Sequence, residues 1–168
     1  MYCTHKSSIF FNILGILILF SAGCSSPDDD VAEFVEPVNA EAIYFEPIGQ
    51  GSQASFDEKT EGVVKDSLSW VSYSEKMQTV LPFRDVDFSQ LMVVFAAVPA
   101  DHGGVTVQFE SAERIGDELV LGYMLGMPGA DCRVIDTPSV PFQVMVTRKI
   151  ELPVRFEYRE ERQPCTMG

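Results

Sequence analysis

Hydrophobic and polar residues alternate with a period of two over four stretches in the second half of the chain. The apolar positions are Val105, Val107 and Phe109; Leu119, Leu121, Tyr123 and Leu125; Phe142, Val144 and Val146; and Val154, Phe156 and Tyr158. Strict alternation is typical of half-buried β-strands. Gly116-Asp117, directly before the second stretch, is a two-residue hairpin signal. The pattern therefore predicts four strands, with the last one exposing a charged face.

Residues 91–98 follow a different pattern, since every position is apolar. A continuous run this short predicts a central strand that is buried on both faces. A further, early strand is predicted over residues 42–47. One helix is predicted after Asp66 or Ser67, which can cap it, because Trp70, Tyr73 and Met77 follow at helical spacing. We read Trp70 as a core residue and expect Pro82 to stop any longer helix.

These elements predict a mainly β fold, a β-sandwich or curved antiparallel sheet with one packed α-helix; α+β is the alternative. Residues 41–168 have the length of a single domain with its own core. No internal repeat or second linker interrupts them.

The N-terminus does not fit this domain. Lys6 precedes an apolar run over residues 9–20, which is shorter than the roughly 20 residues a membrane span needs but suits a signal peptide. The segment Ser21-Ala22-Gly23-Cys24 resembles the motif read by lipoprotein signal peptidase, although Ser21 stands where leucine is usual. That resemblance implies cleavage after residue 23 and lipidation of Cys24. An uncleaved anchor and an ordinary secretory signal are the alternatives.

Residues 24–40 are predicted to form an acidic, flexible tether, since they carry Asp28, Asp29, Asp30, Glu33 and Glu36 but few large apolar residues. The lipoprotein hypothesis places the chain in the bacterial cell envelope, at the outer membrane or cell surface rather than the inner membrane. The membrane contact is then the N-terminal lipid.

The net negative charge of the chain disfavours some classes of binding partner. The whole chain has a net charge of −13, and removal of residues 1–23 takes away one lysine and no acid, leaving −14. Nucleic acid and anionic lipid surfaces are poor partners for such a chain. A basic partner or divalent cations remain open, beside the simpler interpretation of a soluble, self-repelling surface.

Two cysteines remain after cleavage and lipidation, Cys132 and Cys165. In an oxidising envelope, two cysteines in a small exported domain usually pair. The predicted disulfide closes a loop of 34 residues, for which the chain-entropy estimate is about 3.8 kcal/mol. Free thiols in an anaerobe's envelope, or a reactive Cys165, are the alternatives.

Residues 86–148 also carry an ordered set of motifs. Asp87-Phe88-Ser89 opens the buried strand, Asp101-His102-Gly103-Gly104 follows it, and Pro128-Gly129, Cys132 and residues 138–141 come about thirty residues later. This succession resembles the C-terminal domain of the protease complex subunit PrcB family. Members often show Thr-Gly-Gly-Tyr at the turn, from which this chain departs. The resemblance implies an accessory lipoprotein of an envelope protease complex, without catalysis of its own.

The same motifs have a physical interpretation. Asp87 can bond its own following backbone, and Gly103-Gly104 permits the positive φ of a tight reversal. Loops on a rigid scaffold often carry binding, so we predict Asp101, His102, Gly103 and Gly104 as partner-binding residues.

Few residues suit catalysis or a cofactor. Once His5 leaves with the signal, His102 is the remaining histidine. The sequence lacks a Gly-x-Ser-x-Gly elbow, a phosphate-binding loop and a zinc-type cluster of histidines and cysteines. Acid pairs such as Glu110 with Glu113, or Glu118 with Asp131, fit a solvated face better than a glycosidase site. We therefore predict no enzyme activity, no cofactor and no metal.

The leading hypothesis is a non-enzymatic, membrane-anchored lipoprotein whose domain binds or stabilises an envelope protein, such as a protease complex. The second is an envelope module that binds a small ligand or a divalent cation. A hydrolase that uses His102 is the least favoured of the three.

Overall fold

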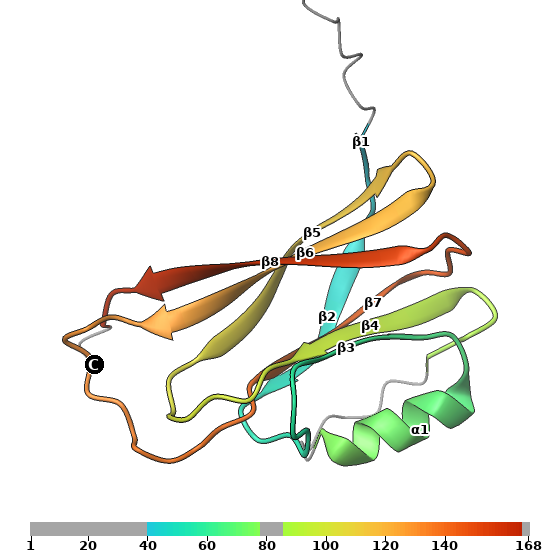
Figure 1. The fold of residues 1–168 in the computed structure, drawn as a ribbon. Helices are drawn as coiled ribbons and strands as arrows, with labels where there is room; N and C mark the ends of the chain where they lie inside the picture. Colours follow the sequence, from blue (N-terminus) through green and yellow to red (C-terminus); the bar gives the residue numbers. More distant parts are fainter. Residues whose placement is uncertain (1–39, 78–85, 166–168) are drawn as a thin grey trace, which may run out of the picture. The chain divides into compact units, whose positions relative to one another are not determined.

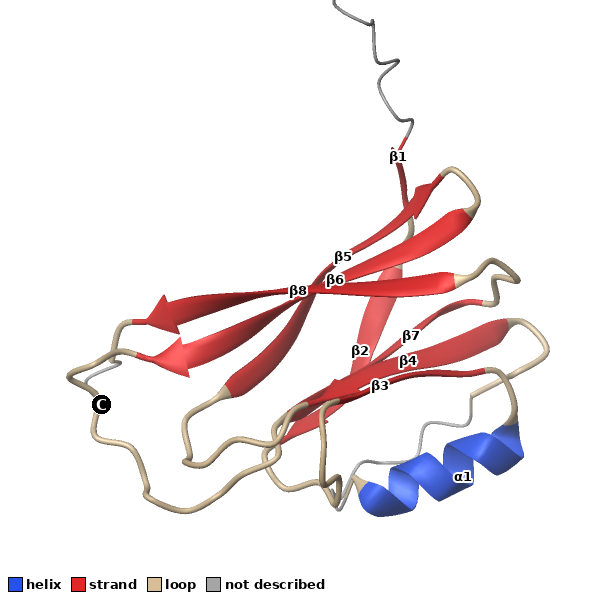
Figure 2. Cartoon of the chain, viewed as in Figure 1, coloured by secondary structure: helices blue, strands red, loops and turns tan. Residues whose placement is uncertain are grey.

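Two four-stranded sheets and one helix make up the part of the chain that the structure, a computed structural model, describes: residues 40–77 and 86–165 (Figure 1). In spatial order, the first sheet contains β1 (Ala40–Ala42), β5 (Thr106–Ile115), β6 (Glu118–Pro128) and β8 (Val154–Gln163). The second contains β2 (Phe45–Gly51), β7 (Phe142–Arg148), β4 (Leu91–Ala97) and β3 (Thr60–Val64). The helix α1 spans Ser67–Lys76. The predicted mainly β fold with one helix is confirmed (Figure 2).

The main core lies between the sheets. It combines the alternating residues of β5 and β6 with every second residue of β4 and with Met145 of β7: Met92, Val94, Ala96, Val107, Phe109, Leu119, Leu121, Tyr123 and Leu125. Because side chains on a strand alternate between its two faces, the polar residues Thr106 and Gln108 of β5 face outward. The period-two pattern of the sequence thus matches one buried face of the first sheet.

A second core fills the other face of the second sheet, where α1 covers it. Trp70 and Met77 pack there with Val93, Phe95 and Val144. The strand β4 therefore lies between two layers, with residues 92–97 all buried. This position explains the continuous apolar run, because a strand covered on both faces has no wet side.

The helix begins as predicted. Asp66 is its N-cap, and one carboxylate oxygen accepts from the Ser69 amide at 2.8 Å. That backbone bond, with a second one from the Ser69 hydroxyl, lowers the pKa of Asp66. Trp70 is 7% exposed, as a core residue should be. The helix ends at Lys76, and Pro82 lies outside the described residues.

Three features differ from the predicted strands. The stretch 42–47 is split, because the chain leaves the first sheet after β1 and enters the second at β2. The strand β3 was not predicted, since its sequence Thr-Glu-Gly-Val-Val carries little alternation. The pair β6–β8 is parallel, so the first sheet is not purely antiparallel.

The strands β5 and β6 form the predicted hairpin, and Gly116 in its turn has a φ of 60°. A register shift interrupts the pair between Phe109 and Ser111. There the buried Gln143 of β7 accepts from the Phe109 amide at 2.6 Å, although the two residues belong to different sheets. One side chain thus satisfies a donor of the irregular strand and ties the sheets together.

A polar cluster joins the sheets again beside β3 and β8. The buried Tyr123 donates from its hydroxyl to Glu61 at 2.5 Å, and Lys59 pairs with Glu61 at 3.1 Å. Tyr158 stacks on Tyr123, with Lys59 4.2 Å from the Tyr158 ring centre. Burial, followed by the bond to Glu61, raises the pKa of Tyr123 well above its ordinary value.

Several N-terminal predictions lie outside the described residues: the signal peptide over 1–23, the lipidated Cys24, and the tether over 24–40 apart from Ala40. Within residues 40–77 and 86–165, no helix is long and apolar enough to cross a membrane.

Candidate binding surface

The predicted partner-binding residues lie on the connection between β4 and β5. Asp101 and Gly104 are exposed, and His102 is half-buried. Gly104 has a φ of 85°, in the left-handed region that glycine adopts without strain, so the predicted reversal is present. The imidazole Nδ1 of His102 lies 2.9 Å from the Gly103 carbonyl, an arrangement that fixes the ring against its own backbone.

This turn is paired with a second loop, residues 129–139. Gly103 donates its amide to the Ile135 carbonyl at 2.9 Å. Ala100 and Ser139 exchange backbone bonds of 2.8 and 2.9 Å, and the Ser139 hydroxyl donates to the His102 carbonyl at 2.9 Å. The two segments thus hold each other, and we call residues 99–105 and 129–139 the paired-loop surface.

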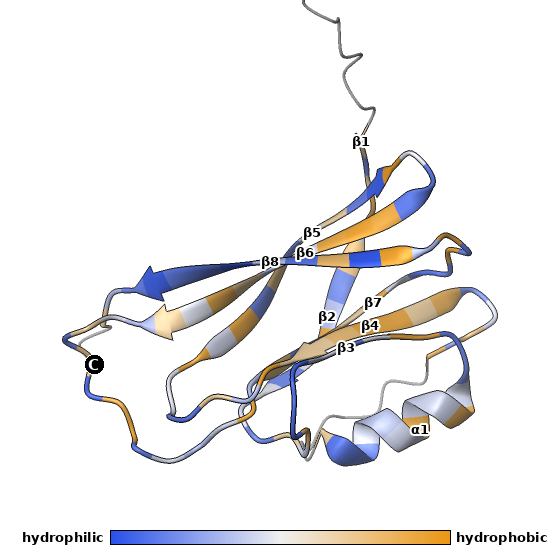
Figure 3. Ribbon diagram, in the orientation of Figure 1, coloured by the Kyte–Doolittle hydropathy of each residue, from blue (hydrophilic) through white to orange (hydrophobic). Residues whose placement is uncertain are grey.

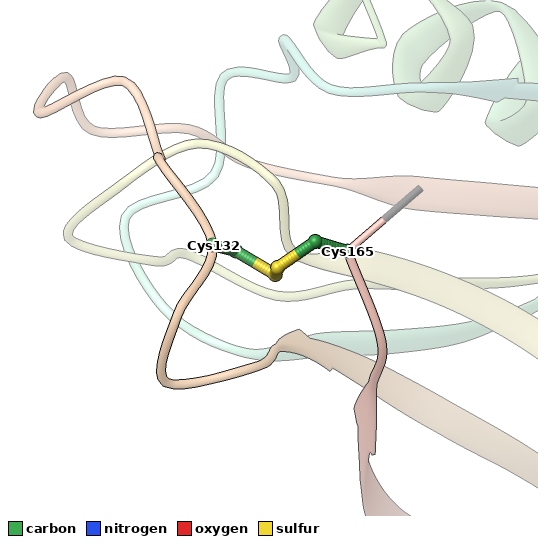
Figure 4. Close-up of a disulfide and its surroundings, with 2 residues drawn as sticks. All are labelled: Cys132 and Cys165. Atoms are coloured by element: carbon green, nitrogen blue, oxygen red, sulfur yellow. A yellow bond between two sulfur atoms is a disulfide. The ribbon is translucent and has the colours of Figure 1, made fainter. Parts of the chain in front are cut away.

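The second loop is also fixed to the end of β8. Cys132 and Cys165 form a disulfide, with their Cα atoms 5.3 Å apart (Figure 4). Gly129 donates its amide to the Gln163 carbonyl at 2.9 Å, and Cys132 donates to the Gly129 carbonyl at 3.0 Å. The disulfide is the bond expected from the cysteine count. It attaches the loop to the C-terminal strand, as the sequence predicted.

Two apolar side chains of this loop are exposed. Ile135 is 73% exposed and Val134 40% exposed, while Gly103 and Gly104 lie beneath them. Neither residue belongs to a motif or an alternating stretch of the sequence. The one signal for them is the apolar pair Val134-Ile135 between Arg133 and Asp136, in a stretch that has no strand alternation.

Two cavities share His102 in their lining. Their volumes are about 350 and 250 Å³, and His102, Met127 and Glu160 line both. The sequence alone does not indicate Met127 and Glu160 as site residues, because only the parallel pairing of β6 with β8 brings them beside the turn.

A separate cavity of about 650 Å³ lies near the chain crossing between β1 and β2. Apolar residues from four segments line it, with Glu41 and Arg148 at its rim: Ala42, Ile43, Tyr44, Val86, Leu91 and Val146. Glu41 and Arg148 form an ion pair of 3.1 Å. Asp87, also in the lining, accepts from the hydroxyl and the amide of Ser89 at 2.6 and 3.0 Å. These bonds lower its pKa and fix the entry to β4, as the sequence predicted.

One acid of each pair considered in the sequence forms an ion pair with an arginine. Glu110 binds Arg159 at 2.7 Å, and Glu118 binds Arg155 at 3.1 Å, on the outer face of the first sheet. The neighbouring carboxylates raise the pKa of both guanidinium groups. Among the residues that the structure describes, no group of three or more histidine, cysteine or acidic side chains is arranged to hold a metal ion.

The chain matches no protein-family model, no curated protein and no solved structure. The resemblance of residues 86–148 to the PrcB family therefore stays a prediction.

Proposed function

We propose that the chain is a non-enzymatic bacterial lipoprotein that binds another envelope protein through the paired-loop surface. The observation that carries the proposal is the exposure of Ile135 and Val134 on a loop that is held by a disulfide and by the turn at Gly103. Large apolar side chains on a monomer's surface are common singly, but a constrained loop that presents two of them favours a protein interface.

The fixed geometry of the loop favours binding energetically. Association loses free energy when it orders mobile loops, and a loop already ordered in the free protein avoids most of that loss. Here the backbone bonds at residues 103, 129 and 139 and the disulfide order the loop before any partner arrives. Apolar side chains on a preorganised loop can therefore contribute strongly to the free energy of binding.

The position of β1 suits a domain that is tethered through its N-terminal side. Ala40 pairs with Ile115 at one end of β5, whereas the turn at residues 101–104 precedes Thr106 at the other end. Ten residues of β-strand separate the two ends by about 30 Å. A lipid tether that joins the domain at Ala40 would leave the paired-loop surface free to meet a partner.

A protease complex is the partner that the family resemblance suggests. The turn at Asp101–Gly104 and the loop with Cys132 and Ile135 both fall inside residues 86–148, the stretch that resembles the PrcB domain. The proposed role is therefore that of an accessory subunit that binds or stabilises the protease.

Site-specific photo-cross-linking in intact cells tests the interface. A benzoylphenylalanine at position 135 should give a discrete cross-linked product, and the same probe at Leu68 should not. Leu68 is a matched control because it is 83% exposed, apolar and located on α1. Equal products at both positions, or none at 135 under conditions that express the candidate proteases, would contradict the proposal.

A second candidate function rests on the cavity near the β1–β2 crossing. Its volume of about 650 Å³ and its apolar lining with a charged rim are ordinary for small-ligand sites. A thermal-shift screen of the purified full chain tests it, since a ligand at a hundredfold excess over its Kd adds about 2.7 kcal/mol of stability. The shift should disappear in Ala42→Trp, which fills the cavity, and a shift that persists there would contradict this site.

A further inference from the structure

The smaller of the two cavities beside His102 has an apolar wall and an acidic mouth. Its volume is about 250 Å³. The apolar part is lined from β6 and from the segments on either side of the turn: Val98, Pro99, Ala100, Val105, Leu125 and Met127. Leu125 and Val105 are each 5% exposed, so this part of the wall is buried in the domain.

Among lysine, arginine and acidic side chains, only acidic ones line this cavity, and these are negative. Asp101 and Glu160 line it, and no lysine or arginine does. Within the described ranges neither carboxylate takes part in an ion pair, although other acids of the same strand do, such as Glu161 with Arg159. The other cavity beside His102, of about 350 Å³, is lined by Arg162 together with Glu160 and the paired Glu161.

Glu160 occupies a position where a sandwich strand normally carries an apolar residue. Val154 and Phe156 on the same face of β8 pack against the core, and Tyr158 follows them. Glu160 comes next on that face, opposite Leu125 of β6. Figure 3 shows the change: β8 becomes hydrophilic toward its C-terminal end, while β6 beside it stays more hydrophobic. Glu160 lies on the inward face of β8. The strand β4 of the second sheet ends at Ala97, before it could cover this part of β8.

We infer that this cavity receives a lysine or arginine side chain of the partner protein, a conclusion that rests on the proposed function. Both side chains combine an apolar stem with a cationic head, and they bury the stem while the head stays near water. The stem would lie against Leu125 and Met127, and the head would bind Glu160 and Asp101 at the mouth. The overall acidity of the chain would favour the approach of such a partner.

Met127 provides a direct readout in the full chain. Its methyl group can be labelled with ¹³C in protein purified in detergent micelles, and its NMR signal is assigned by Met127→Leu. The probes are capped pentapeptides Gly-Gly-X-Gly-Gly, where X is lysine, arginine or norleucine. Norleucine keeps the apolar stem and lacks the charge. We expect a saturable shift of the Met127 signal with lysine or arginine, a much weaker one with norleucine, and none at Met77, which lies in the core under α1.

Charge variants then test the named carboxylates. Glu160→Gln should weaken binding of the lysine peptide about two- to fivefold, the range of an exposed ion pair, and added salt should weaken it further. Asp101→Asn combined with Glu160→Gln should weaken it more. Glu75→Gln on α1 is the matched control and should leave binding unchanged. Equal shifts with norleucine and lysine, or wild-type affinity in the double variant, would overturn the inference.

The outcomes separate this inference from the function on which it rests. A cross-link at position 135 with no charge-dependent shift of Met127 overturns the basic-side-chain site and leaves the interface standing. A charge-dependent Met127 shift without any cross-link at 135 supports the cavity's specificity and contradicts the partner surface around Ile135.

Discussion

Gly62 of β3 has no side chain, and this allows the ring of Phe95 to pack directly against β3. A Cβ placed on this residue would lie 2.2 Å from Cε1 of Phe95, which is fully buried in β4. The aromatic ring occupies the space that any larger residue would need. The strand β3 can therefore pair with β4 at this register only because residue 62 is glycine.

Gly62→Ala should lower the free energy of unfolding by about 1–3 kcal/mol, the usual cost of forcing an extra methyl group into a packed core. Urea denaturation of the full chain measures the change. Gly103→Ala is the control, because a Cβ there meets its nearest atoms at 3.5 Å, an ordinary contact distance. Equal stability of the Gly62→Ala protein and the wild type would show that the Phe95 ring moves aside freely.

Tyr123 makes stability depend on alkaline pH. Its pKa is raised in the folded protein by burial and by the bond to Glu61, whereas in the unfolded chain it titrates near 10. Above that pH the unfolded state binds fewer protons than the folded one, so stability falls as pH rises. Its contribution is fully present below pH 10.

In Tyr123→Phe the alkaline fall in stability should be smaller, and stability at neutral pH should drop by about 1.5–3 kcal/mol with the lost bond to a charged acceptor. Denaturation curves at several values from pH 7 to pH 11 give both numbers. Tyr158→Phe keeps the ring that stacks on Tyr123, and its exposed hydroxyl makes little difference to stability. A pH profile of Tyr123→Phe that parallels the wild type would rule out this residue as the cause.

At the scale of the elements, the irregularity in β5 depends on a side chain from the opposite sheet. The Phe109 amide has Gln143 as its acceptor, at 2.6 Å, at the point where the β5–β6 register shifts. Gln143 is 8% exposed, so water does not replace it easily. This bond is one of the polar contacts that couple the two sheets, and it lies within an apolar core.

Gln143→Leu keeps the volume but leaves the Phe109 amide buried without an acceptor. We expect a loss of about 1–3 kcal/mol of stability, the cost of an unsatisfied buried group. Hydrogen exchange should also quicken at the Phe109 amide, and the exchange of this amide distinguishes the lost bond from general loosening. Gln108→Leu, at the neighbouring exposed position, should change neither quantity. Unchanged protection of Phe109 in Gln143→Leu would contradict the role assigned to Gln143.

The sequence predicts the elements whose pattern is local. The alternation in β5, β6, β7 and β8, the apolar run of β4 and the Asp66 cap each reflect the surroundings of single segments, and the structure confirms these elements. The strand β7 differs from its prediction in one respect, because both of its faces are buried. The pairing of strands that are distant in the sequence does not produce a local pattern of this kind. Nothing in residues 154–163 indicates a parallel partner, and residues 42–47 give no sign that the chain changes sheets at Ile43 and Tyr44.

The candidate site likewise contains features that the sequence predicts and features that it does not. The reversal at Gly104 and the pairing of Cys132 with Cys165 follow from residue type and count, and the structure contains both. The cavity beside Met127 and Glu160 depends on the parallel pair β6–β8 and on the point where the second sheet ends. Both features belong to the assembled domain, and the hydrophobic pattern of one segment does not predict them.

At the scale of the whole molecule, the disulfide connects stability with the binding surface. Replacing both Cys132 and Cys165 by serine should lower stability by up to about 3.8 kcal/mol, because the unfolded chain regains the entropy of the open loop. Denaturation of the wild type with and without a dithiol reductant gives the same comparison without mutation. The serine variant should also give less cross-link at position 135, and full cross-linking in it would show that the backbone bonds alone hold the loop.

The lipid anchor is the remaining part of the proposal, and the chain contains its own control. If Cys24 carries the lipid, Cys24→Ser should abolish labelling of the protein by radioactive palmitate and leave residues 1–23 uncleaved, because Cys24 belongs to the motif that the signal peptidase reads. Cys3→Ser removes a cysteine that leaves with the signal peptide, and should change neither result. Continued labelling of Cys24→Ser would place the lipid elsewhere, whereas a soluble wild-type protein would contradict the lipoprotein hypothesis itself.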